Sequence, residues 1–249
     1  MVLQKEDGVY YAEQFLNFYD CDCYMRLKLS SVMKYIADVA GVDYTLKGYD
    51  HEYLWNNGMV FLLSRTNIAV QRMPMAYETI TLSTWEQGKK GSQFLRHFEL
   101  FDEKGEKIIS AATAWLLVDP QTRKILRPEV FTGFMPIRGD KLPDCAMPGK
   151  LRMPEGGSPA GTRKIRYSDL DGNGHVYNAV YGDIACDVLP AEVLKRPLRS
   201  FQINYQTEAV LGEEVELCVA VDPDAPDTFY IEGRNAAGGN CFICKYAVI

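Results

Sequence analysis

Hydrophobic and polar residues alternate along most of this chain in short runs separated by turn-forming residues, a pattern typical of β-strands. Two longer stretches, residues 32–47 and 177–189, instead repeat their apolar residues at helical spacing. The first is apolar over most of its circumference, which is typical of a buried helix. Pro190 closes the second. The pattern therefore predicts one buried helix in each half of the chain, with strands around it.

The predicted elements come in the same order in both halves. We expect strands at residues 8–18, 59–71, 78–86, 93–101 and 107–118 in the first half, and at 164–167, 200–208, 214–221, 228–234 and 240–248 in the second. Each half then consists of a strand, a helix and further strands. This order indicates an internal repeat, with a sheet wrapped round a central helix in each copy.

Proline and glycine are concentrated between the two copies. Six of the twelve prolines and six of the twenty glycines fall within residues 128–161, which show little hydrophobic periodicity. We interpret this segment as a linker between an N-terminal unit, residues 1–127, and a C-terminal unit, residues 162–249.

The loops before the two predicted helices align without a gap, 149 positions apart. The aligned pairs are Asp20 with Asp169, Asp22 with Asp171, Tyr24 with Asn173, Arg26 with His175, and Leu27 with Val176. The first copy thus has tyrosine and arginine where the second has asparagine and histidine. We therefore expect the second copy to hold the chemistry and the first to serve as scaffold or pocket.

Asp171, Asn173 and His175 lie where a polar loop enters the second helix. The first N–H groups of a helix lack intrahelical partners and the helix dipole is positive there, so an anion or a developing oxyanion is stabilised. A simpler interpretation also applies, because Asp and Asn in a glycine-rich loop ordinarily form turns. Asn178 is in turn expected to cap the helix rather than to take part in chemistry.

The composition is that of an ordinary globular protein, with 249 residues, 47% hydrophobic and 24% charged. A net charge of −6 argues against a general nucleic-acid binder. There is no apolar run of about 18 residues and no apolar segment near Met1. Seven cysteines, an odd number, fit a reducing compartment better than a disulfide framework. We therefore expect a cytoplasmic protein with no membrane or nucleic-acid partner.

Two features that could suggest metal chemistry have simpler interpretations. Cys241 and Cys244 have CxxC spacing, but residues three apart on a strand point to opposite faces and cannot share a metal. His51 and His97 have no carboxylates converging on them in the sequence, and we interpret both as structural or surface residues. The sequence predicts no metal site and no cofactor.

The string SDLDGNGHVYNAVY, residues 168–181, resembles the D-x-N-x-H-V segment of acyl-acyl carrier protein thioesterases, which are double hotdog proteins. GMVFLLSRTNIAV, ITLSTWEQGKKG, ATAWLLVDPQTRKILRP and INYQTEAVLGEEV are similar to further segments of that family, in its order. The resemblance covers most of residues 8–248. It implies an α+β tandem hotdog fold, in which two antiparallel sheets each wrap round a long central helix.

The resemblance also implies the roles of particular residues. Asp171, Asn173 and His175 match the catalytic Asp, Asn and His of the family, and Glu208 matches its catalytic Glu. Ala209 stands where the plant enzymes carry a cysteine, so direct attack by water is implied, without a thiol nucleophile. The implied reaction is hydrolysis of the thioester bond of acyl-acyl carrier protein, which releases free fatty acid. The sequence leaves open which of the two carboxylates, Asp171 or Glu208, is the general base.

The implied substrate needs an apolar slot and a docking surface. We expect the acyl chain to enter the N-terminal unit, between the helix of residues 32–46 and the strand at residues 60–63. An acyl carrier protein is acidic, so basic residues are expected near the mouth of the site, although each cluster is also explained as an ordinary solvated face. The candidate clusters are Arg163, Lys164 and Arg166; Lys195, Arg196 and Arg199; and Arg123, Lys124 and Arg127.

Three other functions stay open at this point. The first is a hotdog acyl-coenzyme A thioesterase. The second is an enoyl-thioester hydratase, although hydratase motifs usually space Asp and His more widely and lack a partner like Glu208. The third is a non-catalytic module that binds acyl thioesters. The sequence also leaves open the acyl-chain length, the choice between carrier protein and coenzyme A, and whether the chain forms a homodimer.

Overall fold

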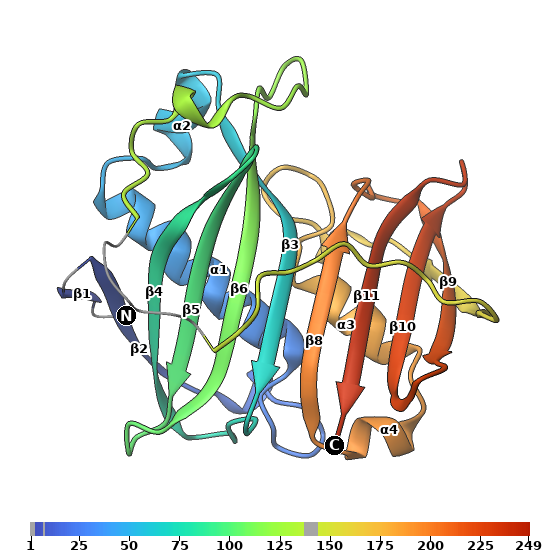
Figure 1. Cartoon of the computed structure of the whole chain (residues 1–249). Helices are drawn as coiled ribbons and strands as arrows, with labels where there is room; N and C mark the ends of the chain where they lie inside the picture. Colours follow the sequence, from blue (N-terminus) through green and yellow to red (C-terminus); the bar gives the residue numbers. More distant parts are fainter. Residues whose placement is uncertain (1–2, 7, 137–143) are drawn as a thin grey trace.

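Antiparallel strands form one continuous eleven-stranded sheet in this computed structural model, which describes residues 3–6, 8–136 and 144–249. The strand order is β1-β2-β4-β5-β6-β3-β8-β11-β10-β9-β7 (Figure 1). The strands are β1 (Leu3–Glu6), β2 (Val9–Phe15), β3 (Val60–Val70), β4 (Thr79–Lys90), β5 (Gln93–Phe101), β6 (Lys107–Val118), β7 (Ser158–Lys164), β8 (Leu198–Tyr205), β9 (Glu214–Asp222), β10 (Ala225–Asn235) and β11 (Asn240–Val248). The helices are α1 (Leu29–Leu46), α2 (His51–Asn56), α3 (Val180–Asp187) and α4 (Ala191–Lys195).

The two halves of the sheet meet edge to edge at β3 and β8. Backbone pairing there runs from Arg65 with Asn204 to Ala69 with Ser200. Helices α1 and α3 lie on the same face of the sheet, one behind each half (Figure 1). The two helices pack closely at Gly182 of α3, where an added Cβ would come within 3.0 Å of the Met33 sulfur. The predicted α+β architecture, with a sheet around a helix in each half, is confirmed.

The core explains why α1 is apolar on most sides. Val32, Ile36 and Val39 are buried against β-strands of the N-terminal half, and one continuous core joins them to the buried residues of α3. Removing each such aliphatic side chain from water stabilises the fold by about 1.5–3 kcal/mol. A second, smaller apolar cluster lies beside α2. Its buried members are Leu54, Met59, Phe94, Leu117, Phe131 and Phe134.

Several predicted boundaries are wrong. The strand expected at residues 164–167 lies earlier, at Ser158–Lys164, and Tyr167–Asp169 forms a 3₁₀ turn. Strand β7 is an edge strand with most residues exposed, so it lacks the buried alternation on which the prediction depended. It begins inside the segment interpreted as a linker, and residues 137–143 of that segment lie outside the described residues.

The helices differ from prediction in length. Helix α3 is shorter than the predicted 177–189, whereas α1 begins three residues before the predicted start at residue 32. Helices α2 and α4 and strand β1 were not predicted, because elements of four to six residues are too short to show a period. In the described residues, no helix is long and apolar enough to cross a membrane.

Candidate active site

The loop that carries Asp171, Asn173 and His175 is a tight turn fixed by its own backbone. Asp171 Oδ1 accepts a hydrogen bond from the Asn173 N–H at 2.8 Å, and the Asp171 N–H donates to the carbonyl of His175 at 2.9 Å. Gly174 has φ 79°, a left-handed conformation that suits glycine. The turn-forming interpretation of Asp171 is therefore confirmed, and it is compatible with a chemical role for the carboxylate.

The same loop is held against the segment after β8, which carries Glu208. The Val176 N–H donates to the carbonyl of Ala209 at 3.0 Å, and His175 forms an isolated bridge with Val210. This pairing brings His175 Nε2 to 3.4 Å from Glu208 Oε2. Both side chains are partly exposed, so they can be reached by water and by a substrate.

The start of α3 differs from the expectation for Asn178. Ala179 occupies the N-cap position and makes no side-chain cap, so Asn178 is not the cap. Its carbonyl instead accepts a hydrogen bond from the Tyr205 hydroxyl at 3.1 Å, and the residue lines the cavity described below. Among the N–H groups of residues 175–178, those of Val176 and Tyr177 are taken by the carbonyls of Ala209 and Asp169. An oxyanion hole built from this set would thus use His175 and Asn178.

One cavity of about 1520 Å³ joins this site to the N-terminal half. It exceeds the roughly 300–1,000 Å³ of typical small-ligand pockets. Asp171, Asn173, His175 and Glu208 line one part of it, and apolar residues of α1, α2 and β3 line another. Residues 60–63, expected from the sequence to line an acyl slot, are among them. The four predicted site residues and the predicted slot therefore share a single cavity.

A buried cluster of charges lies beside the N-terminal part of this cavity. Arg96, which lines the cavity, contacts Asp43 Oδ2 at 2.6 Å and Glu86 Oε1 at 3.4 Å through Nη2. Lys47 Nζ lies 3.1 Å from Asp43 Oδ2 and 3.2 Å from Glu86 Oε2. The two cations and two carboxylates balance in number, which is how charges are ordinarily tolerated in an interior.

Sequence reasoning did not place three further residues in the cavity. Asp38 on α1 is a carboxyl group whose pKa burial raises, against the opposing charge of Lys34. Cys241 on β11 also lines the cavity, and burial raises the pKa of its thiol to about 11, so it is protonated near neutral pH. Arg123, predicted only as part of a basic cluster, lines the cavity and forms an ion pair with Glu208.

The other two basic clusters contribute no residue to the lining of the cavity. Arg163 pairs with Asp169 at 2.8 Å and Arg196 with Asp227 at 2.6 Å, and neither residue lines the cavity. Arg123 therefore marks the basic cluster that lies at the candidate site.

The loop before α1 has the same backbone geometry as the loop before α3. Asp22 Oδ1 accepts from the Tyr24 N–H at 2.8 Å, the Asp22 N–H donates to the Arg26 carbonyl at 2.7 Å, and the Leu27 N–H donates to the Pro74 carbonyl at 2.8 Å. Met25, with φ 64°, takes the place of the second copy's glycine. The alignment of the two loops in sequence is thus matched by these three hydrogen bonds.

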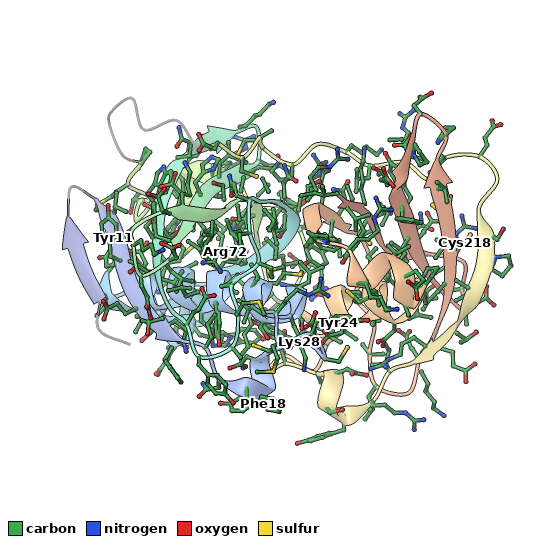
Figure 2. All side chains as sticks on the ribbon, turned by 90° about the horizontal axis from the view of Figure 1, so that it is seen from below. Tyr11, Phe18, Tyr24, Lys28, Arg72 and Cys218 are labelled. Carbon is green, nitrogen blue, oxygen red and sulfur yellow. The ribbon has the colours of Figure 1, made fainter. Side chains whose placement is uncertain are left out.

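The side chains of the first loop make contacts that differ from those of the second loop. The Arg26 guanidinium donates to the carbonyl of Leu194 at 2.6 Å and to the next two carbonyls at the end of α4. Tyr24, which stacks on that guanidinium, lies beside the boundary between the two halves (Figure 2). By the matched backbone bonds, Met73 stands where the second copy has Glu208. The first loop therefore holds the two halves together, and the first copy does not have counterparts of Asn173, His175 and Glu208.

Two helices, each against one half of a continuous antiparallel sheet, with corresponding loops before them, define a double hotdog protein. Residues 8–132 match the family model of the acyl-ACP thioesterase N-terminal domain, and residues 158–238 match that of the acyl-ACP thioesterase C-terminal domain. The chain belongs to the acyl-acyl carrier protein thioesterase family.

Individual relatives are distant in sequence. A chloroplastic acyl-[acyl-carrier-protein] hydrolase of Cuphea viscosissima is 24% identical over 240 residues, which are 88% of this chain and 57% of the relative. A chloroplastic palmitoyl-acyl carrier protein thioesterase of Cuphea hookeriana is 23% identical, over 88% of this chain and 56% of the relative. This chain thus spans little more than half the length of these plant relatives.

Solved structures share the fold along the whole chain. An acyl-ACP thioesterase from Bacteroides thetaiotaomicron superposes with a TM-score of 0.89 at 22% identity, over 98% of each chain. The 12:0-ACP thioesterase from Umbellularia californica superposes with a TM-score of 0.81 at 16% identity, also over 98% of each chain.

Proposed function

We propose that this chain hydrolyses the thioester bond of acyl-acyl carrier protein and releases the free fatty acid. The observation that carries the proposal is the shared cavity, in which a water-accessible set of Asp171, Asn173, His175 and Glu208 opens into an apolar slot. A thioester placed at the four polar residues would extend its acyl chain between α1 and β3. The slot lies in the N-terminal half and the reacting groups lie in the C-terminal half, as in the arrangement implied by the family.

The geometry supports separate roles for Asp171, Glu208 and His175. Asp171 accepts a hydrogen bond from the Asn173 N–H and donates its own N–H to the His175 carbonyl, so it holds the backbone of both residues in place. Glu208 takes a proton from water as the water attacks the thioester carbonyl, a role that typically accelerates a reaction by about 10²–10⁴-fold. His175 protonates the leaving sulfur as the C–S bond breaks. The Glu208 carboxyl group then passes its proton to the His175 imidazole, whose Nε2 lies 3.4 Å from Glu208 Oε2.

The nature of the leaving group and the compartment belong to the same proposal. The thiol that leaves is the phosphopantetheine arm of a carrier protein, and the basic residues Lys124 and Arg127, which follow Arg123 in the chain, receive the acidic surface of that protein. All seven cysteines are free in the structure, which supports a reducing compartment such as the cytoplasm.

The test is release of free thiol from a panel of acyl-acyl carrier protein and acyl-coenzyme A thioesters. We expect wild-type protein to release thiol from the carrier-protein series, and Glu208→Gln and His175→Ala to reduce kcat by about 10²-fold or more. No thiol release from any thioester would refute the proposal. A faster reaction with coenzyme A would assign the chain to acyl-coenzyme A hydrolysis, and loss of enoyl absorbance without thiol would assign it to hydration.

The duplicated loop offers a matched control for Asp171. Asn keeps the side-chain oxygen that accepts the turn hydrogen bond but removes the charge, so Asp171→Asn tests chemistry while the turn is preserved. Asp22→Asn removes the charge at the matching position of the first copy, where the corresponding turn bond is also 2.8 Å, although there it also weakens the ion pair of Asp22 with Arg26 at 2.8 Å. We expect activity to fall only in Asp171→Asn. A wild-type kcat in Asp171→Asn would mean that Asp171 serves the turn alone.

A further inference from the structure

The hairpin loop after β6 places a cation from the N-terminal half on the Glu208 carboxylate of the C-terminal half. Arg123 Nη2 donates to Glu208 Oε2, the oxygen that also lies 3.4 Å from His175 Nε2. We propose that Arg123 is a positioning residue, which fixes the Glu208 carboxylate beside His175 for thioester hydrolysis. The inference rests on the proposed function and assigns a role to a residue outside the predicted four.

The loop holds Arg123 in a defined place. Asp119 Oδ1 accepts hydrogen bonds from the N–H groups of Gln121 at 2.8 Å and Thr122 at 2.9 Å. The Arg123 N–H donates to the Asp119 carbonyl at 2.9 Å, and the Asp119 N–H donates to the Lys124 carbonyl at 2.9 Å. These bonds close the turn on both sides of the arginine. The backbone position from which the Arg123 side chain extends is therefore set by a hydrogen-bonded turn.

The stability of the fold does not explain an arginine at this position. Arg123 has φ 60°, a left-handed conformation that suits glycine or asparagine and is unfavourable for a long side chain. Its ion pair is partly exposed, with side-chain exposures of 52% for Arg123 and 31% for Glu208, and such pairs add little stability. A backbone outlier that contacts a candidate reacting group points to function.

The position of the pair suggests what the arginine does. Glu208 follows β8 in a partly exposed segment, where its carboxylate could rotate into solvent. A guanidinium and an imidazole that share Oε2 restrict that rotation. Because the two partners come from different halves, the pair also ties the acyl slot to the reacting carboxylate. A displacement of about 1 Å at such a site can cost roughly 10²-fold in rate.

The test uses Arg123→Gly and Arg123→Lys, with Met25→Gly as a matched control. Met25, with φ 64°, has the same left-handed conformation but lies in the first copy's loop, away from the cavity. We expect Arg123→Gly to leave Tm unchanged or raise it by about 1–4 °C, while kcat falls about 10- to 100-fold and KM changes little. Arg123→Lys should recover part of kcat, because lysine keeps the charge without the planar fork. Met25→Gly should leave kcat unchanged.

Two outcomes would overturn the inference about Arg123 and leave the proposed function intact. If wild-type protein releases thiol and Arg123→Gly matches it in kcat, Arg123 does not position Glu208. If Arg123→Gly raises KM at unchanged kcat, the arginine binds the substrate instead. The proposed function is refuted by a different result, namely that wild-type protein releases no thiol. Failure of the inference and failure of the proposed function can therefore be told apart.

A double substitution and a crystal structure complete the test. In the Glu208→Gln background, Arg123→Gly should cause no further loss of kcat if the arginine acts through Glu208; a further loss of tenfold or more would contradict this. A crystal structure of Arg123→Gly tests the inference without an activity assay. The Glu208 carboxylate is expected to turn away from His175, and a carboxylate that stays in hydrogen-bonding range of the imidazole would overturn the inference.

Discussion

Replacing Arg96 by methionine should destabilise this protein far more than replacing any exposed arginine. Methionine has similar length and can pack where the aliphatic part of Arg96 packs, so the substitution mainly removes the guanidinium. The guanidinium lies in the interior, where the side chain is 3% exposed, and its partners Asp43 and Glu86 are 0% and 1% exposed. After the substitution, Lys47 is the cation left in the cluster to face two buried carboxylates.

The size of the effect follows from the two ion pairs that the substitution removes. Arg96 Nη2 lies 2.6 Å from Asp43 Oδ2 and 3.4 Å from Glu86 Oε1. Each hydrogen bond to a charged group contributes about 1.5–3 kcal/mol. Removing one partner from a buried ion pair typically costs about 3–5 kcal/mol, because a buried charge is left uncompensated. We therefore expect a loss of about 3–5 kcal/mol in the free energy of unfolding, or a fall in Tm of roughly 6–20 °C.

Urea denaturation of wild type, Arg96→Met and Arg72→Met measures the difference. Arg72 is the matched control because it also contacts two carboxylates, Glu78 at 2.8 Å and Asp102 at 3.3 Å, but its side chain is 42% exposed. An exposed pair contributes about 0–1 kcal/mol, so Arg72→Met should lose no more than that. Similar losses in both variants would refute the reasoning. They would mean that water in the cavity, which Arg96 lines, already screens the cluster.

Two further predictions concern the slot and the pH dependence of stability. Leu62→Trp adds bulk to the cavity wall formed by β3, so kcat/KM for the longest acyl thioesters should fall by about 10- to 100-fold while short chains are spared; an unchanged chain-length profile would contradict this. Burial lowers the pKa of His97 to about 4 from its ordinary value of 6.5, so the unfolded state binds more protons between these values and stability falls as pH drops through this window. His97→Phe should flatten the curve of unfolding free energy against pH between about 6.5 and 4, by up to about 3 kcal/mol at the acidic end, and an unaltered slope in urea titrations would count against it.

The elements that could be predicted are those with a buried face and clear ends. Strands β5, β6 and β11 have the predicted bounds, because buried residues alternate or run together between marked turns. Strand β7 could not be placed, because an exposed edge strand has no apolar face to read. The joining of the two sheets at β3 and β8 also escaped prediction, since the pairing is between segments far apart in the chain.

In the candidate site, too, local sequence pattern predicted some residues, and those that depend on long-range contacts escaped prediction. Local pattern placed Asp171 and His175 in one polar loop that leads to a helix, although α3 begins only at Val180, whereas Glu208 was connected to them only through the family resemblance. Arg123 and Glu208 are 85 positions apart, and the contact between them depends on how two units dock. A sequence pattern describes neighbours along the chain, so it could not reveal a residue that acts across the joint. The nearest signal was the basic character of residues 123–127, which suggested a docking surface rather than an ion pair inside the cavity.

The duplicated loop separates what the backbone supplies from what the side chains and their surroundings supply. Both copies have the same turn bonds, so the turn itself cannot be what distinguishes a reacting centre. In the first copy Arg26 meets the last carbonyls of α4, and this contact closes the joint between the halves. In the second copy His175 meets a cavity and a carboxylate. Placing the counterparts of Asn173, His175 and Glu208 in the first copy would therefore not transfer activity, because the loop there faces the end of a helix instead of a space that can admit a thioester.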